Sequence, residues 1–202
     1  MYARLAFVLL SSAAFAQWTP QLSMKVKTVT AAVPSPDGKL AVWTETHAVM
    51  DGEKSESLTQ VYLAHTDGSG RMQLTRGEKS ANAPAFSTDS AWVFFASDRS
   101  GKRNLYRIAV DGGEAEQLTN WTGTMGAYSV SPNGKWIVFL TYEKEVKGHP
   151  ANQDVILRLM EVSTSKISVL AKLFGGQGTM NVPSWSPDSS QVAFVSYQRV
   201  YP

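Results

Sequence analysis

Apolar runs and polar turns alternate along this chain, most clearly between residues 83 and 119. Residues 92–97 form a continuous apolar run rich in aromatic residues, as expected for a strand that is buried on both faces. Residues 104–110 alternate between apolar and polar side chains, which is the period of a strand with one buried face. A hairpin signal, Asp-Gly-Gly, then precedes a short polar strand at 116–119. Together with the extended stretch at 83–86, this pattern predicts four antiparallel strands.

A short polar turn precedes an apolar run four times, at intervals of 52, 44 and 55 residues between the first Ser positions. In such a turn Pro presets φ, Asp or Asn caps the turn through its side chain, and Gly tolerates positive φ. The second and fourth copies have Ser in place of Gly, so we expect them to avoid positive φ or to be slightly strained. The copies are Ser35-Pro36-Asp37-Gly38, Ser87-Thr88-Asp89-Ser90, Ser131-Pro132-Asn133-Gly134 and Ser186-Pro187-Asp188-Ser189.

An aromatic residue stands eight positions after the Ser of each turn. Because these residues recur in register with the apolar runs, we interpret them as core residues and not as a platform for stacking a ligand. We expect the corresponding strand cores at 40–44, 92–97, 136–141 and 192–197. The four aromatic residues are Trp43, Phe95, Phe139 and Phe194.

A supersecondary unit copied at this period predicts an all-β fold, a β-propeller of four-stranded antiparallel blades. The propeller domain covers residues 17–202, with full units at about 31–75, 83–119 and 127–171 and a partial fourth unit at 181–202. The ring is then either incomplete or four-bladed. Residues 18–29 could supply an outer strand to the fourth unit. An unpaired apolar edge would remain around residues 192–195, so we expect self-association through the incomplete blade or poor solubility.

The first 16 residues have the features of a signal peptide. Arg4 precedes a short apolar run at 5–10, and Ala14-Phe15-Ala16 is an Ala-x-Ala cleavage site. The alternatives are a buried strand or a membrane anchor, but the run is too short to span a bilayer. We therefore expect cleavage after Ala16, a periplasmic or secreted protein, and no membrane span after cleavage.

Composition narrows the range of partners. The net charge is +2 and the basic residues are scattered, which argues against nucleic acid as the main partner. The chain has no Cys, which excludes disulfides and thiolate metal sites.

These motifs resemble the TolB-type, WD-repeat-like propeller blade, in which Ser-Pro-Asp-Gly, Ser-Asp-Arg, Asp-Gly-Gly and Leu-Thr follow one another. Residues 25–119 look most like the N-terminal propeller of secreted prolyl oligopeptidase-family serine peptidases. Residues 148–197 are more similar to stand-alone exported TolB-like proteins. The resemblance implies the fold and leaves two functions open, because both groups share the blade.

The sequence predicts no catalytic, cofactor or metal site. It has no Gly-x-Ser-x-Gly motif, which the hydrolase class needs for its nucleophile. His47, His65 and His149 are far apart, and we interpret them as loop or strand-edge residues. The carboxylates at 51–53 and at Asp98 lack calcium-site spacing, and the Gly-rich segment 175–178 lacks the residues of a phosphate loop. The charged loop at 142–152 could contact a partner.

Two hypotheses follow. The first is an exported, non-catalytic propeller that acts as a binding or protein-interaction module for an unidentified protein or peptide. The alternative is the N-terminal propeller of a prolyl oligopeptidase-type serine peptidase, of the acylaminoacyl or dipeptidyl peptidase kind, without its α/β-hydrolase domain.

Overall fold

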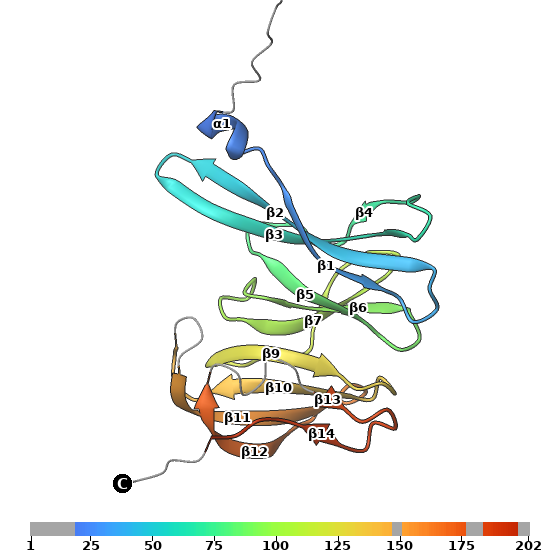
Figure 1. The fold of residues 1–202 in the computed structure, drawn as a ribbon, viewed down its shortest axis with the longest axis vertical. Helices are drawn as coiled ribbons and strands as arrows, with labels where there is room; N and C mark the ends of the chain where they lie inside the picture. The colour runs from blue at the N-terminus through green and yellow to red at the C-terminus, as the bar shows by residue number, and fades with distance from the viewer. Residues whose placement is uncertain (1–18, 147–150, 177–183, 198–202) are drawn as a thin grey trace, which may run out of the picture.

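The computed structural model describes residues 19–146, 151–176 and 184–197, and this part of the chain is almost entirely β (Figure 1). Its single described helix is the short α1 (Pro20–Ser23), which the side chain of Thr19 caps. Three four-stranded antiparallel sheets follow one another along the stack, and a two-stranded sheet comes after them. The predicted all-β propeller, with three full blades and a partial fourth, is confirmed.

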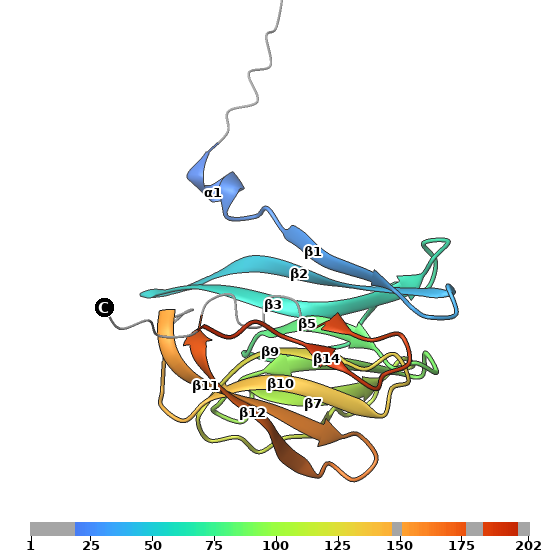
Figure 2. The ribbon, with the colours of Figure 1, turned by 60° about the horizontal axis from the view of Figure 1, so that its bottom comes forward.

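Each blade is a meander in which consecutive strands pair (Figures 1 and 2). The first blade contains β1 (Thr28–Pro34), β2 (Leu40–Asp51), β3 (Lys54–His65) and β4 (Met72–Gln73). The second contains β5 (Ala81–Phe86), β6 (Trp92–Ser97), β7 (Asn104–Ala109) and β8 (Glu116–Gln117). The third contains β9 (Thr124–Val130), β10 (Trp136–Tyr142), β11 (Ala151–Glu161) and β12 (Ile167–Gly176). The fourth contains β13 (Ser184–Trp185) and β14 (Val192–Ala193).

The first blade carries a hairpin longer than its turn pattern predicts. β2 and β3 pair without interruption from Leu40 opposite His65 to Asp51 opposite Lys54. Gly52 has a φ of 58° at the tip, a conformation that Gly adopts without steric cost. The expected strand core at 40–44 is therefore only the first part of β2.

Apolar side chains fill the spaces between neighbouring blades, because the two faces of each sheet can be buried only against the sheets beside it. Val42 and Val61 of the first blade share one cluster with Phe95 and Tyr106 of the second. Phe94 of the second blade packs with residues of the third in the next cluster. Adjacent aromatic residues on β6 thus face opposite neighbours, as the alternation of a strand requires.

The fourth blade corrects two expectations. The strand predicted at 192–197 is paired only at Val192–Ala193. The chain then turns toward the third blade, where the backbone N–H of Tyr197 donates to the carbonyl of Phe174 on β12 at 2.9 Å. Phe194 was expected in the core, but 40% of it is exposed. In the described residues β14 has no third strand beside it, so nothing covers this ring as the neighbouring strands cover Phe95.

The N-terminal segment also differs from expectation. The sequence left open that residues 18–29 could supply an outer strand to the fourth blade. Instead, α1 occupies part of this segment, and Thr28 and Val29 begin β1, which pairs with β2 of the first blade. The hydrogen bonds of β1 are therefore made within its own blade. The expected signal peptide, residues 1–16, lies outside the described residues.

Candidate functional site

The four repeat turns share one hydrogen-bond network. In each, the hydroxyl of the first Ser donates to the side-chain oxygen of Asp or Asn two residues later, at 2.6, 2.5, 2.8 and 2.5 Å in chain order. The same hydroxyl accepts a backbone N–H five residues on, at 2.9 to 3.0 Å. The Asp or Asn oxygen also accepts the N–H two residues further on. These residues therefore build the turn that starts each second strand, which is a structural role.

Hydrogen bonds to the carboxylates stabilise their charged form. The Ser35 and Ser87 hydroxyls lower the pKa of Asp37 and Asp89, with help from a backbone N–H in each turn. In the fourth turn the Ser186 hydroxyl and the N–H and hydroxyl of Ser190 lower the pKa of Asp188 to about 2. The three side chains are thus ionised at neutral pH and have no proton to donate.

The four repeat aromatics have different surroundings. Phe95 and Phe139 are fully buried, and Phe95 stacks on Tyr106 with ring centroids 5.6 Å apart. Trp43 of the first blade is half-buried and stacks on Tyr62 at 6.1 Å. Its indole N–H donates to the carboxylate of Glu45 at 3.1 Å.

Glu45 is a buried carboxylate at the centre of a charged network on the first blade. It is only 6% exposed and accepts a hydrogen bond from Arg71 at 2.5 Å, and the ammonium of Lys27 lies 3.6 Å away. Burial raises the pKa of Glu45, but the bonds from Arg71 and Trp43 outweigh it and the net pKa is lowered. Arg71 also lies over the Tyr62 ring, 4.7 Å from its centroid. The network thus shields the aromatic pair of the first blade.

Sequence reasoning missed two buried amides that hold the connections between blades. Gln60, 2% exposed, donates to the carbonyls of Gly77 and Lys79 and accepts from the Thr75 hydroxyl. Asn104, 1% exposed, repeats the arrangement in the second blade, where it accepts from Thr119. Equivalent residues of the two blades are 44 positions apart in the sequence: Asn104 follows Gln60 by 44, and Thr119 follows Thr75 by 44. That spacing was already visible in the repeated Leu-Thr and could have revealed them.

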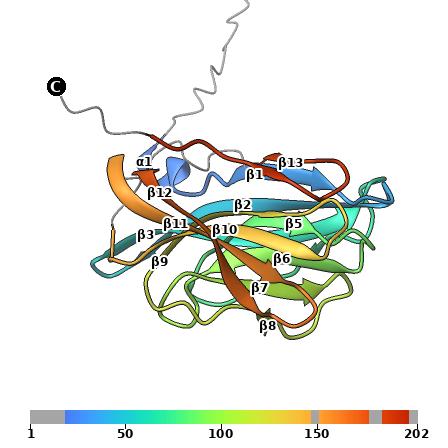
Figure 3. The same ribbon diagram turned by 90° about the horizontal axis from the view of Figure 1, so that it is seen from below.

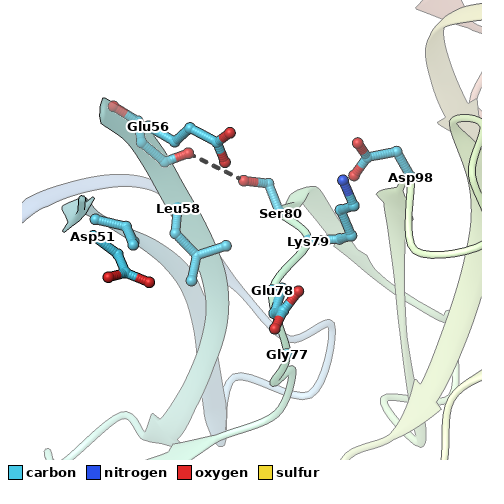
Figure 4. Close-up of a pocket in the computed structure, with 10 residues that line it drawn as sticks. Asp51, Glu56, Leu58, Gly77, Glu78, Lys79, Ser80 and Asp98 are labelled. Carbon is cyan, nitrogen blue, oxygen red and sulfur yellow. Dashed lines mark hydrogen bonds between the residues drawn. The ribbon is translucent and has the colours of Figure 1, made fainter. Parts of the chain in front are cut away.

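The connection that Gln60 holds forms one wall of a hollow, which we call the hairpin hollow (Figure 4). Its volume is about 610 Å³. The last residues of β2, the first residues of β3, the β4–β5 connection and Asp98 after β6 surround it. Its lining residues are Val49, Asp51, Glu56, Ser57, Leu58, Gly77, Glu78, Lys79, Ser80 and Asp98.

Hydrogen bonds fix the walls of the hairpin hollow. The Ser80 hydroxyl accepts from the N–H of Thr59 at 3.1 Å and donates to the carbonyl of Ser57 at 3.5 Å. The Ser97 hydroxyl donates to the carbonyl of Ser80 at 2.8 Å, which ties the connection to the second blade. The walls of the hollow are therefore backbone segments that hydrogen bonds fix in place.

The lining of the hairpin hollow carries four carboxylates and one ammonium group. Glu56 and Asp51 come from the long hairpin, and Glu78, Lys79 and Asp98 come from the facing connections (Figure 4). The lining contains no His, and it therefore offers no imidazole base for its two serines. This arrangement can bind a cationic group by electrostatic attraction, but it has no groups for acyl transfer.

The histidines noted in the sequence are not brought together in the described part of the chain. His47 lies opposite Leu58 in the long hairpin, and His65 ends β3, whereas His149 lies outside the described residues. Within the described part of the chain, no group of three or more His, Cys, Asp or Glu side chains could hold a metal ion. Of the carboxylates considered for calcium, Asp51 at the hairpin tip and Asp98 after β6 both line the hairpin hollow.

The charged loop at 142–152 is partly engaged by its own scaffold. Glu143 pairs with Arg158 at 3.0 Å, and Glu145 pairs with Lys102 of the second blade at 3.0 Å. Residues 147–150 lie outside the described residues. The two described carboxylates of this loop therefore connect the third blade to itself and to its neighbour.

The stacked four-stranded blades define this chain as a β-propeller. The family model of the TolB beta propeller domain matches residues 17–199, and the chain belongs to that family.

Two curated relatives, one uncharacterised protein and one peptidase, illustrate the similarity of this chain to known proteins. An uncharacterised protein of Agrobacterium fabrum, Atu1656, is 34% identical over 163 residues, which cover 81% of this chain and 53% of the relative. Dipeptidyl-peptidase 5 of Porphyromonas gingivalis is 31% identical over 137 residues, which cover 68% of this chain and 19% of the relative. The chain thus spans about half of the first relative and about a fifth of the second.

Solved structures agree on the fold. An Agrobacterium tumefaciens structure that carries the provisional designation TolB matches with a TM-score of 0.65 and 33% identity, over 85% of this chain and 60% of that one. Pyrococcus horikoshii acylaminoacyl peptidase matches with a TM-score of 0.59 and 10% identity, over 80% of this chain and 27% of that one. Among the described residues, no helix has the length and apolar character needed to cross a membrane.

Proposed function

We propose that this chain is an exported, non-catalytic TolB-like propeller that binds a protein or peptide partner, and that the hairpin hollow is the contact surface. The hollow supports this function because its backbone walls are held by Gln60 and Ser80 and need little ordering when a partner binds. Its four carboxylates against one ammonium group favour a basic segment of that partner.

The charge of the hairpin hollow makes this function testable with labelled peptides. We expect an eight-residue Lys- and Arg-rich peptide to bind more tightly than a Glu-rich one in fluorescence anisotropy, with an affinity that falls as salt is added. Replacing two lining carboxylates, Glu56→Gln with Glu78→Gln, should weaken binding several-fold, by about 1 kcal/mol. The matched control replaces two exposed acids of the β7–β8 turn, Asp111→Asn with Glu114→Gln. Equal loss in both double variants would refute the hollow as the site.

Export is the second part of the proposal. The Ala14-Phe15-Ala16 site after a short apolar run supports cleavage after residue 16. Mass spectrometry of periplasmic protein should find Gln17, in some molecules cyclised, as the first residue. Soluble cytoplasmic protein with an intact Met1 would contradict export.

Self-association through the fourth blade is the third part. The exposed large apolar side chains of the described residues lie at the two ends of the stack and none lies in the second blade; they are Leu22, Met24, Val26, Val29, Met50, Val169, Leu170, Phe194, Val195 and Tyr197. An apolar cleft of about 250 Å³ also lies between the third blade and the fourth, with Trp185 and Phe194 in its lining. Light scattering should show association that Phe194→Lys with Val195→Lys reduces. A monodisperse wild-type monomer at high concentration would contradict it.

One alternative function has a specific observation in its favour. The identity of 31% to dipeptidyl-peptidase 5 over 68% of this chain supports a propeller that gates substrate access to a peptidase domain. An α/β-hydrolase reading frame with Gly-x-Ser-x-Gly directly downstream of the codon for Pro202 would favour the peptidase, and an unrelated gene would favour the binding module. In either case we expect this chain alone to hydrolyse no acyl-peptide or X-Pro substrate. Turnover that a serine-directed phosphonate abolishes would overturn that expectation.

A further inference from the structure

The repeat turns lie beside one another along one side of the stack (Figures 1 and 3). A side-chain hydroxyl joins each neighbouring pair. Between the first and second blades, the backbone N–H of Asp37 donates to the Ser90 hydroxyl at 3.2 Å. Between the third and fourth, the N–H of Asn133 donates to the Ser189 hydroxyl at 2.9 Å. In both pairs, the third residue of the upstream turn contacts the fourth residue of the downstream turn.

These bonds explain why Ser replaces Gly in two of the turns. Ser90 and Ser189 have φ values of 59° and 62°, in the left-handed region that is sterically unfavourable for residues with a Cβ atom. Gly38 and Gly134 occupy the same place in the other turns, with φ values of 73° and 69°. The Ser side chain therefore has a steric cost within its own turn and gains a bond to the neighbouring blade.

The second and third blades are joined in the opposite way. Here the upstream turn carries a hydroxyl at its second position, and Thr88 donates to the carbonyl of Pro132 at 3.3 Å. A Cβ atom added to Gly134 would lie 2.4 Å from the Thr88 hydroxyl oxygen. A hydroxyl at the second position upstream therefore excludes a side chain at the fourth position downstream.

We propose that these contacts form a latch between blades, and that the latch determines which blade can dock beside another. A turn with Pro at its second position takes a downstream turn with a hydroxyl at its fourth position. A turn with Thr at its second position takes a downstream turn with Gly. All three neighbouring pairs of this chain obey the rule.

The latch assigns a partner to the open side of the fourth turn. Pro187 occupies its second position, and among the described residues the N–H of Asp188 has no acceptor from a further turn. The fitting occupant is a blade of the same type whose turn carries a hydroxyl at its fourth position. The first turn of a second copy has Gly38 there and lacks the hydroxyl, so a second copy would dock without the latch.

A double-mutant cycle between the second and third blades tests the rule. Gly134→Ser alone should clash with Thr88, and Thr88→Pro alone should lose the bond. Thr88→Pro with Gly134→Ser recreates the arrangement of the other two pairs, so we expect its folding equilibrium constant to exceed that of Gly134→Ser by about tenfold in denaturant titration. Additive effects would overturn the latch.

A single substitution covers the case in which Gly134→Ser does not fold. Ser90→Ala keeps the left-handed backbone and removes only the hydroxyl, and it should lower the folding constant about two- to tenfold. Ser165→Ala is the matched control, because Ser165 also has a positive φ, of 55°, but is exposed in the β11–β12 turn of a single blade. Equal effects of the two substitutions would overturn the latch.

The first turn offers a test of the docking rule with the intact chain. Gly38 has a positive φ and open space around the position of a Cβ atom, so Gly38→Ser can place a hydroxyl where Ser90 and Ser189 have theirs. We expect Gly38→Ser to raise the self-association constant about two- to tenfold in sedimentation equilibrium. Gly38→Ala is the control, because it adds the same backbone strain without the hydroxyl. Equal association of the two variants would overturn the assignment of the open side.

Discussion

The second and fourth blades begin with turns that share one Ser–Asp hydrogen bond, and they then diverge. In both, a Ser hydroxyl bonds to the Asp two residues later at 2.5 Å. Phe95 of the second blade is nevertheless fully buried, whereas Phe194, at the same position of the fourth, is 40% exposed. Phe95 lies in a six-residue strand between two partner strands, while Phe194 follows a strand of two residues. The turn is thus a local property of four to six residues, but burial depends on the strands and blades beside it.

The largest expected effect comes from the two aromatic residues themselves. Phe95→Ala should destabilise the chain by about 3–5 kcal/mol, because it removes a buried ring from the cluster between the first two blades. Phe194→Ala should cost less than about 1 kcal/mol, because 40% of its surface is already exposed to water. Denaturant titration with an unchanged m-value measures both. Similar losses at the two positions would show that the fourth blade is packed as well as the second.

The same comparison shows what the sequence could predict. The second blade follows its pattern closely, because 92–97 and β6 coincide and the turn is determined by its own Ser and Asp. For the fourth blade the same pattern predicts a strand to residue 197, but pairing ends at Ala193. An apolar run specifies that a strand can form, whereas its partners decide how far it extends and whether Phe194 is covered.

The hairpin hollow could not be predicted for a related reason. Its lining comes from the hairpin, the β4–β5 connection and Asp98, which are brought together only when the first two blades pack. The sequence drew attention to Asp51 and Asp98 separately, as hairpin carboxylates. The length of the hairpin depends on strand pairing, and the position of Lys79 depends on the buried Gln60, which bonds to its carbonyl, so no local pattern contains them.

A smaller effect should come from the buried amide of the second blade. Asn104 bonds to the carbonyls of Lys102 and Trp121 and accepts the N–H of Trp121 at 2.6 Å. Asn104→Ala leaves these backbone groups without that partner and should cost about 1–3 kcal/mol in denaturant titration. The exposed neighbour Asn120→Ala is the control and should change stability by less than about 0.5 kcal/mol. Equal losses would mean that Asn104 does not hold the connection.

The smallest effect concerns the acid range, where the second and fourth turns differ in the residue two positions after the Asp. Ser190 donates to both carboxylate oxygens of Asp188, at 2.9 and 2.8 Å, whereas the corresponding residue of the second turn is Ala91. The pKa of Asp188 is accordingly lowered to about 2, and that of Asp89 is lowered without this second hydroxyl. We expect Ser190→Ala to raise the pKa of Asp188 toward that of Asp89 in a carboxyl titration followed by NMR. An unchanged pKa would show that the first hydroxyl and the backbone N–H suffice.

The lowered pKa values also predict how the stability of the fold changes with pH. A carboxylate with a lowered pKa in the folded state stabilises that state above its unfolded pKa of about 3.9, and the contribution disappears as the pH falls through the folded pKa. Asp37, Asp89 and Asp188 should therefore make unfolding easier between about pH 4 and pH 2. The third turn makes the same bonds with Asn133, which does not titrate. Replacing the three Asp residues by Asn should thus preserve the turns at pH 7 and flatten the acid dependence of the unfolding midpoint. A dependence as steep as that of the wild type would place its origin in other carboxylates, such as the buried Glu45.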